Sequence, residues 1–262
     1  MPLSWPQHPI WQRLAALPVQ GTRWILPQVC HGCHQPLTPG FASPLQRFLC
    51  EACTHDLPWV SGHTDNLTWV QENAWVPSPV LPGLDRLEVA LAYTEPVEHW
   101  LPAYKYTGRH QLGPLLGAML AHAFGPTRFA QGLPCDLLVP VPLHPKRLWW
   151  RGFNQALHLV HGWKRALASL PHNRQWVAQM PAVDARPLQR IRATPPQARL
   201  GAEARRQNVE GAFLGQYPQL IEGRRVWLVD DVITTGATLT TCAHLLRQMG
   251  ATEVGALVLA RA

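Results

Sequence analysis

The segment from Val226 to Thr238 constrains the fold of this chain more than any other. It has the sequence Val-Trp-Leu-Val-Asp-Asp-Val-Ile-Thr-Thr-Gly-Ala-Thr. Four apolar residues predict a short buried strand, and the two acidic residues at its carboxyl end can engage ribose hydroxyls or a divalent cation. The turn that follows can present backbone N–H groups to a phosphate at the start of a helix. The segment therefore predicts a site for a phosphorylated sugar; the alternative is that Asp230 and Asp231 only open a turn and cap a helix.

The residues after this segment complete a βαβ unit. Apolar side chains recur at helical spacing from Leu239 to Met249, and Gly250 is a typical helix stop. A second strand is expected from Val254 to Leu259. Ligands of such units bind at the carboxyl ends of the strands. The pattern predicts an α/β fold in which helices flank a parallel sheet.

The chain length of 262 residues suits one large domain with a small appendage. We place the boundary after residue 62, with an amino-terminal module over 1–62 and the main domain over 63–262. No apolar run approaches the ~18 residues that a membrane span needs. The amino terminus also lacks the basic-then-apolar order of a secretory signal. We therefore expect a cytoplasmic protein without membrane insertion.

Four cysteines in two pairs predict a metal site in the amino-terminal module. Cys30 and Cys33 form one C-x2-C pair, Cys50 and Cys53 form the other, and sixteen residues separate the pairs. This spacing is typical of a four-thiolate structural zinc site. Two disulfides are the alternative, which a reducing cytoplasm disfavours. So short a module lacks a core of its own, and we expect it to need Zn²⁺ to fold.

Positive charge is concentrated in one part of the chain. The net charge is +7, and residues 140–225 carry fourteen Lys/Arg against four Asp/Glu. Such a segment suits a polyanion, whether pyrophosphate, a nucleotide or nucleic acid. An ordinary solvated basic face is the alternative, because it has the same composition.

Two cations follow the first strand and helix of the main domain. A strand is expected over 87–93, a helix over 97–106 and a second helix over 112–124. Lys105 and Arg109 lie beside the glycine break between the two helices. Taken alone, such cations can simply be solvated helix ends.

A second cationic stretch follows an apolar strand expected over 136–142. We expect residues 143–155 to form a loop with three cations and two tryptophans, including Arg147 and Arg151. A loop at this edge of a sheet can hold a pyrophosphate group. Trp149 and Trp150 can stack on unpaired bases beside these cations, although we expect at least one of them to pack inside. Further on, the basic and proline-broken residues 190–213 predict a flap over the site.

The run from Val226 to Thr238 resembles the phosphoribosyl pyrophosphate (PRPP) loop of type I phosphoribosyltransferases. The resemblance covers all thirteen positions and implies that Asp230 and Asp231 hold the ribose hydroxyls. It also implies that the turn residues cradle the 5′-phosphate, namely Thr234, Thr235, Gly236, Ala237 and Thr238. Purine transferases of this fold often carry a base-contacting carboxylate where this chain has Thr234. A purine salvage activity is therefore not expected.

The order of motifs along the whole chain resembles the ComF/GntX family of competence-associated proteins. Besides the four cysteines and the PRPP loop, the motifs are Lys-Tyr-x-Gly-Arg at 105–109, Val-Pro-Val-Pro-Leu-His at 139–144 with Arg-Gly-Phe-Asn-Gln at 151–155, and Thr-x-x-Gln with Arg-x-x-Asn between 194 and 208. The resemblance implies a phosphoribosyltransferase-like fold. It also implies a role in DNA uptake, with handling of internalised single-stranded DNA.

Two functions follow from these observations. In the first, the pocket binds PRPP or a related phosphorylated sugar or nucleotide, while Arg147, Trp149, Trp150 and Arg151 contact single-stranded DNA. Other DNA-uptake proteins are then candidate partners. In the second, the protein is an active Mg²⁺-dependent phosphoribosyltransferase with a non-purine acceptor. There Lys105, Arg147 and Arg151 stabilise the pyrophosphate that leaves Mg²⁺-bound PRPP.

Overall fold

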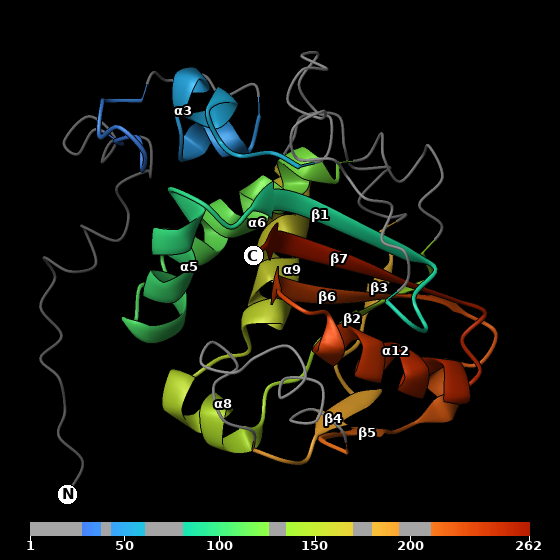
Figure 1. The fold of residues 1–262 in the computed structure, drawn as a ribbon. Coiled ribbons are helices and arrows are strands. Elements are labelled where there is room, and N and C mark those ends of the chain that lie inside the picture. The colour runs from blue at the N-terminus through green and yellow to red at the C-terminus, as the bar shows by residue number, and fades with distance from the viewer. Residues whose placement is uncertain (1–27, 38–42, 61–80, 126–134, 170–179, 194–210) are drawn as a thin grey trace, which may run out of the picture.

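A five-stranded parallel sheet organises the main domain (Figure 1). The computed structural model describes residues 28–37, 43–60, 81–125, 135–169, 180–193 and 211–262. Across the sheet the strand order is β1-β7-β6-β2-β3, and all four pairings are parallel. The strands are β1 (Arg86–Ala92), β2 (Leu137–Pro140), β3 (Ala182–Val183), β6 (Arg225–Ile233) and β7 (Glu253–Arg261).

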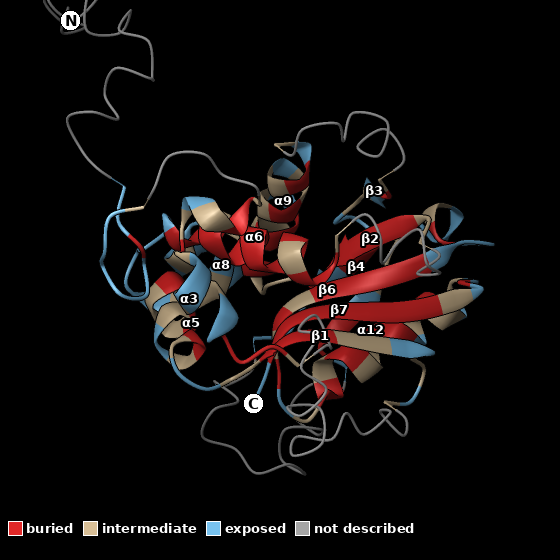
Figure 2. Cartoon of the chain, turned by 90° about the horizontal axis from the view of Figure 1, so that it is seen from above, coloured by how far each residue is buried: buried red, intermediate tan, exposed pale blue. Residues whose placement is uncertain are grey.

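The two central strands β6 and β7 are almost continuously buried, as the red bands of Figure 2 show. Alternate side chains of β6 belong to different cores: Trp227 and Val229 pack on one face of the sheet, and Val226 and Leu228 on the other. Both faces must therefore be covered by helices. This explains why the strands lack the alternation of polar and apolar residues that a one-sided sheet would have.

One face of the sheet is covered by α6 (Leu112–Ala123) and α9 (Gln155–Ala168), with α5 (Val97–Tyr106) beside them. The other face is covered by α12 (Ala237–Gln248). Helices α6 and α9 approach closely because glycines meet at their crossing. A Cβ atom built on Gly117 would lie 2.4 Å from the backbone carbon of Gly162, so no larger residue fits there.

The amino-terminal module lies against the side of the main domain that carries α6 (Figure 1). It contains the short helices η1 (Leu45–Arg47) and α3 (Glu51–His55). Leu45 and Leu49 are fully buried in the same core as α6. Trp59 joins the module to β1 through a bridge with Leu91. These apolar contacts supply the core that so short a segment cannot build alone.

Most of the predicted elements in these ranges are confirmed. The predicted strands 87–93 and 254–259 and the predicted helices 97–106, 112–124 and 239–249 correspond to β1, β7, α5, α6 and α12. The strand predicted at 226–229 is longer than expected, because β6 runs on through the acidic pair to Ile233. Residues 194–210, the centre of the predicted flap, lie outside the described residues. Within the described ranges, no helix has both the length and the apolar composition to cross a membrane.

The loop predicted over 143–155 is wrong for its central part. Residues Pro145–Arg151 form a helix, α8. His144 caps it, since its Nδ1 accepts a hydrogen bond of 3.1 Å from the backbone N–H of Lys146. Pro145 takes the first helical position, where its missing N–H costs nothing, and Gly152 ends the helix with a left-handed φ of 80°. A proline at this position is thus compatible with a helix start.

Candidate functional site

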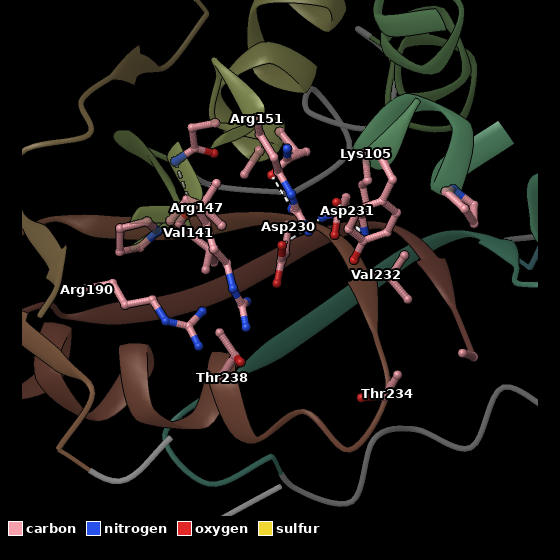
Figure 3. Close-up of a pocket in the computed structure, with 18 of the residues that line it drawn as sticks. Lys105, Val141, Arg147, Arg151, Arg190, Asp230, Asp231, Val232, Thr234 and Thr238 are labelled. Carbon is pink, nitrogen blue, oxygen red and sulfur yellow. Dashed lines mark hydrogen bonds and ion pairs between the residues drawn. The ribbon is translucent and has the colours of Figure 1, made fainter. Parts of the chain in front are cut away.

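A cavity of about 800 Å³ opens at the carboxyl ends of β2 and β6 (Figure 3). The chain leaves β2 toward α9 on one face of the sheet, and leaves β6 toward α12 on the other face. The loops after these neighbouring strands therefore diverge, which is the topological switch point where open α/β sheets bind ligands. Its walls come from α5, α8, α9, β4 and β6, and from the first turn of α12.

Asp230 and Asp231 form one wall of this cavity, at the end of β6. The Nζ atom of Lys105, on α5, lies 2.9 Å from Oδ2 of Asp231. The side chains of this pair are only 17% and 11% exposed, so the ion pair is shielded from water. The carboxylate of Asp230 accepts a hydrogen bond from the backbone N–H of Asp231 at 2.9 Å. The wall therefore has a fixed geometry.

Burial and neighbouring charges set the protonation of this wall. Burial and the adjacent carboxylate of Asp231 raise the pKa of Asp230 to about 7. Burial alone would lower the pKa of Lys105, but the charge of Asp231, the hydrogen bond to it and the charge of Asp230 together outweigh burial and raise that pKa. A cation or a pair of hydroxyl donors beside Asp230 would favour its ionised form.

The turn between β6 and α12 contains a left-handed glycine and adjoins the cavity. Gly236 has φ 77°, a left-handed conformation that favours glycine, and it caps the amino end of α12. A Cβ atom on this residue would also lie 2.2 Å from the side chain of Leu81. Thr234 and Thr238 line the cavity, and the Thr235 hydroxyl accepts a hydrogen bond from the backbone N–H of Ala237 at 3.4 Å. The twelve-residue helix α12 directs its positive end toward this turn.

Three arginines line the cavity beyond the acidic pair. Arg147 and Arg151 come from α8, and Arg190 comes from β4 (Leu188–Arg190), which pairs with β5 (Phe213–Gly215) in a separate antiparallel sheet. Figure 3 shows Arg147 and Arg190 on the opposite side of Asp230 from Lys105. Burial lowers the pKa of Arg147 and of Arg190, and each pKa is lowered further by the positive charge of a neighbouring arginine. A bound polyanion would relieve this repulsion.

Both tryptophans of α8 are exposed, which corrects the expectation that at least one would pack inside. Trp149 is 87% exposed and Trp150 is 64% exposed. The reason is that α8 has no buried residue and stands out from the body of the domain. Trp150 lines the cavity together with Arg147 and Arg151.

Several residues that line the cavity were missed by the sequence analysis as site residues. Arg190 was recognised only as part of a basic motif, Tyr106 only as part of Lys-Tyr-x-Gly-Arg, and Asn154 and Gln155 only as part of Arg-Gly-Phe-Asn-Gln. Asn154 has a structural role, because its Nδ2 donates to the Val141 carbonyl at 3.1 Å and so joins the start of α9 to the end of β2. The motifs were the available signal, but without the fold they did not show which of their residues line the cavity.

The four cysteines of the amino-terminal module come together in space. The Sγ atoms of Cys30, Cys33, Cys50 and Cys53 all lie within 4.8 Å of one another, and all four are free thiols. Backbone N–H groups of Gly32 and Cys50 donate to the Cys30 sulfur at 3.4 and 3.3 Å. The four sulfurs can hold a metal ion.

Electrostatics at these sulfurs also fit a cation. Burial raises the pKa of Cys30, but hydrogen bonds to its sulfur outweigh burial and lower the pKa to about 6, which favours the thiolate that metals bind. Burial and the neighbouring sulfurs raise the pKa of Cys53. A bound cation would attract the sulfurs and so favour their thiolate forms. Gly32 lies so close to the group that a Cβ atom there would be 2.8 Å from the Cys53 sulfur.

Comparisons with known proteins agree with the fold. Residues 186–262 match the phosphoribosyl transferase domain family. The chain is 30% identical over 239 residues to DNA utilization protein YhgH of Escherichia coli (strain K12), an alignment that covers 87% of this chain and 95% of the relative. It is 32% identical over 215 residues to Competence protein F of Haemophilus influenzae, covering 81% of this chain and 84% of the relative.

Among solved structures, the chain is similar to a glutamine PRPP amidotransferase from Bacillus subtilis. The sequence identity is 21%, the TM-score is 0.31, and the match covers 58% of this chain and 26% of that chain. So limited a likeness has no bearing on the function.

Proposed function

Because this chain belongs to the ComF/GntX family and is a competence-related protein with a phosphoribosyltransferase-like fold, we propose that it binds PRPP and handles single-stranded DNA during DNA uptake. A related phosphorylated sugar or nucleotide is an equivalent ligand for the cavity. We place this activity in the cytoplasm, where internalised DNA arrives, with other DNA-uptake proteins as partners.

The cavity supports a ligand that carries both hydroxyls and phosphates. Asp230 and Asp231 offer carboxylates to ribose hydroxyls or to Mg²⁺, and the turn 234–238 offers backbone N–H groups to a 5′-phosphate. Mg²⁺ bound with the pyrophosphate would supply positive charge next to these carboxylates. Arg147, Arg151 and Arg190 can balance the remaining negative charge.

One observation carries the proposal for DNA: some side chains of α8 line the cavity, while others on the same helix face the solvent. Arg147 and Arg151 line the cavity, while Trp149 on the same helix is 87% exposed. Exposed indoles beside guanidinium groups are the combination that binds unpaired strands without sequence preference, through stacking and phosphate contacts. The bases of a double helix are already stacked on one another, so neither tryptophan could stack on them.

Oligonucleotide binding at several salt concentrations tests this proposal. We expect single-stranded DNA to bind with little sequence preference, and log affinity to fall with log salt at a slope of roughly −0.7 per neutralised phosphate. Arg147→Ala with Arg151→Ala should reduce the magnitude of that slope by roughly 1.4. Arg47→Ala, an exposed arginine on η1, is the matched control and should keep the slope. An oligonucleotide that fails to bind at low salt, while PRPP still binds, contradicts the DNA proposal.

An active Mg²⁺-dependent phosphoribosyltransferase with a non-purine acceptor is the second candidate. It is favoured by the position of Lys105, which reaches the acidic pair in a cavity that also contains Arg147 and Arg151. Cations in that arrangement can stabilise a leaving pyrophosphate. Release of pyrophosphate from PRPP in the presence of pyrimidine bases or small amines would support it. No release with any such acceptor contradicts it.

We also propose that the four cysteines hold one structural Zn²⁺. Four thiolates around a tetrahedral ion complete its coordination, so the metal has a structural role. Elemental analysis should find one zinc per chain, and Cys50→Ser with Cys53→Ser should remove it. Cys135→Ser is the matched control, since this free cysteine lies outside the cluster. A boundary between this module and the main domain near residue 62 remains part of the proposal.

A further inference from the structure

The three central residues of the Arg-Gly-Phe-Asn-Gln motif at 151–155 build the turn between α8 and α9. Gly152 ends α8 with a left-handed φ of 80°. The ring of Phe153 packs edge-on against a buried tyrosine of α5, with the ring centroids 5.0 Å apart. Asn154 caps α9, since its Oδ1 accepts a hydrogen bond of 3.2 Å from a backbone N–H in the first turn. The two end residues, Arg151 and Gln155, have no part in these contacts.

Gln155 is a buried amide at the start of α9, and the residue is only 4% exposed. Its Oε1 accepts a hydrogen bond of 3.0 Å from the NH1 group of Arg151, and its Nε2 donates to the Phe153 carbonyl at 3.5 Å. The opposite orientation of the amide would place donor against donor and oxygen against oxygen. Gln155 therefore offers one acceptor in a fixed position, and Arg151 occupies it.

Arg151 is held from a second side by α5. Its guanidinium carbon lies 4.6 Å from the ring centroid of Tyr106, the last residue of α5, which is a cation–π contact. The long arginine side chain would otherwise lose much rotamer entropy on binding a ligand. Figure 3 shows Arg151 directed from α8 toward the acidic pair. An anion at this place would meet a guanidinium that is already oriented.

Two other roles for Gln155 fit the structure less well. Direct contact with a ligand is opposed by its burial, because a residue that is 4% exposed offers almost no surface. A role in packing alone would be met by an apolar side chain of the same size, without the cost of removing an amide from water. The hydrogen bond to Arg151 accounts for a polar residue at this buried position.

We infer that Gln155 is a positioning residue, which orients the Arg151 guanidinium toward a phosphate oxygen of the ligand in the cavity. This inference rests on the proposed function, because it requires a ligand that carries phosphate. Gln155 acts through Arg151 and does not touch the ligand. The two ends of the motif then share one task, and the three central residues set the distance between them.

A double-mutant cycle measured by calorimetry with Mg²⁺–PRPP tests this inference. Arg151→Ala should weaken binding about tenfold, because a charged hydrogen-bond donor is lost. Gln155→Met keeps the length of the side chain and removes its hydrogen bonds, and it should weaken binding about fivefold. In the Arg151→Ala background the same change should cost less than about twofold, since no guanidinium is left to orient. Gln216→Met is the matched control, because it removes an amide hydrogen bond to Gln189 outside the cavity lining.

A second variant keeps the test open if Gln155→Met does not fold. Arg151→Lys retains the positive charge but loses the planar fork that Gln155 holds. It should fold, because α8 has no buried residue. We expect it to weaken PRPP binding about fivefold, close to the effect of Gln155→Met. An affinity equal to that of the unaltered protein would mean that charge alone acts at this position, and would overturn the inference.

A single-stranded oligonucleotide, titrated into the same variants, separates this inference from the PRPP proposal. If PRPP binds and Gln155→Met weakens it equally with and without Arg151, the positioning role is wrong and the PRPP proposal stands. If only the oligonucleotide binds and its affinity shows the coupling between the two residues, the positioning role is supported and the PRPP proposal is wrong. If only the oligonucleotide binds and the coupling is absent, or if neither ligand binds, both are wrong.

Discussion

The two walls of the cavity differ in nearly every physical property. The wall on β6 is acidic and dry: Asp231 and Lys105 form an ion pair with side chains 11% and 17% exposed. The wall on α8 is cationic and wet: Arg147 and Arg151 line it together with Trp150, which is 64% exposed. The difference teaches that one cavity can combine a rigid part, which selects a small ligand by its shape, with an adaptable part that tolerates different partners.

Burial explains the difference. Charges in a shielded place interact strongly and keep one arrangement, since leaving one of them unpaired costs several kcal/mol. The exposed tryptophans of α8 interact through solvent and can adjust their rotamers. We therefore expect the β6 wall to recognise its ligand through contacts with individual ligand atoms. The α8 wall should contribute affinity that depends on salt and little on sequence.

The sharpest way to separate the walls is to neutralise the acidic one. Asp230→Asn with Asp231→Asn should abolish Mg²⁺-dependent PRPP binding, a loss of more than about 100-fold, because two charged acceptors disappear. Calorimetry measures this loss, and Glu222→Gln, an exposed residue outside the cavity lining, is the control. Single-stranded DNA should still bind the double variant. Unaltered PRPP affinity in that variant contradicts the site.

The stability of the ligand-free protein should reveal the free-energy cost of ionising Asp230 in the acidic wall. The folded-state pKa of Asp230 is raised from 3.8 to about 7, so the folded protein holds a proton that the unfolded chain releases between these values. Stability from this group is therefore present below about pH 4 and is lost as the pH rises through 7. Asp230→Asn should increase the free energy of unfolding at pH 8 by roughly 1–3 kcal/mol and have little effect near pH 4. Chemical denaturation at both pH values measures this, and an equal effect at both contradicts the raised pKa.

The smallest expected effect comes from Trp149, which is 87% exposed on α8 beside the cationic wall. Trp149→Ala should weaken oligonucleotide binding about tenfold and leave the salt slope unchanged, because stacking releases no counterions. Fluorescence anisotropy at several salt concentrations measures both quantities. Trp149→Phe should retain part of the affinity. A reduced slope in Trp149→Ala would mean that the tryptophan acts through phosphate contacts, against the proposed division between walls.

Much of the fold was predictable because its signals are local. The run from Val226 to Thr238 is continuous in sequence, and the structure keeps it continuous as the end of β6, the turn and the start of α12. The two cysteine pairs were likewise sufficient to predict that four sulfurs meet. The helix α8 was missed because the segment after the strand was read as a loop, whereas Pro145 at the first helical position and the cap by His144 start a helix there.

The sequence by itself determined most of the elements and the chemical groups, since turn, capping and periodicity signals act over a few neighbouring residues. Only the tertiary structure decided which groups meet. Lys105 reaches Asp231 from more than a hundred residues away, and Arg190 enters the cavity from a separate two-stranded sheet. The exposure of Trp149 and Trp150 is also a tertiary result, because it depends on α8 standing clear of the core. The physical reason is that strand order places β2 beside β6, and nothing local in the chain encodes that neighbourhood.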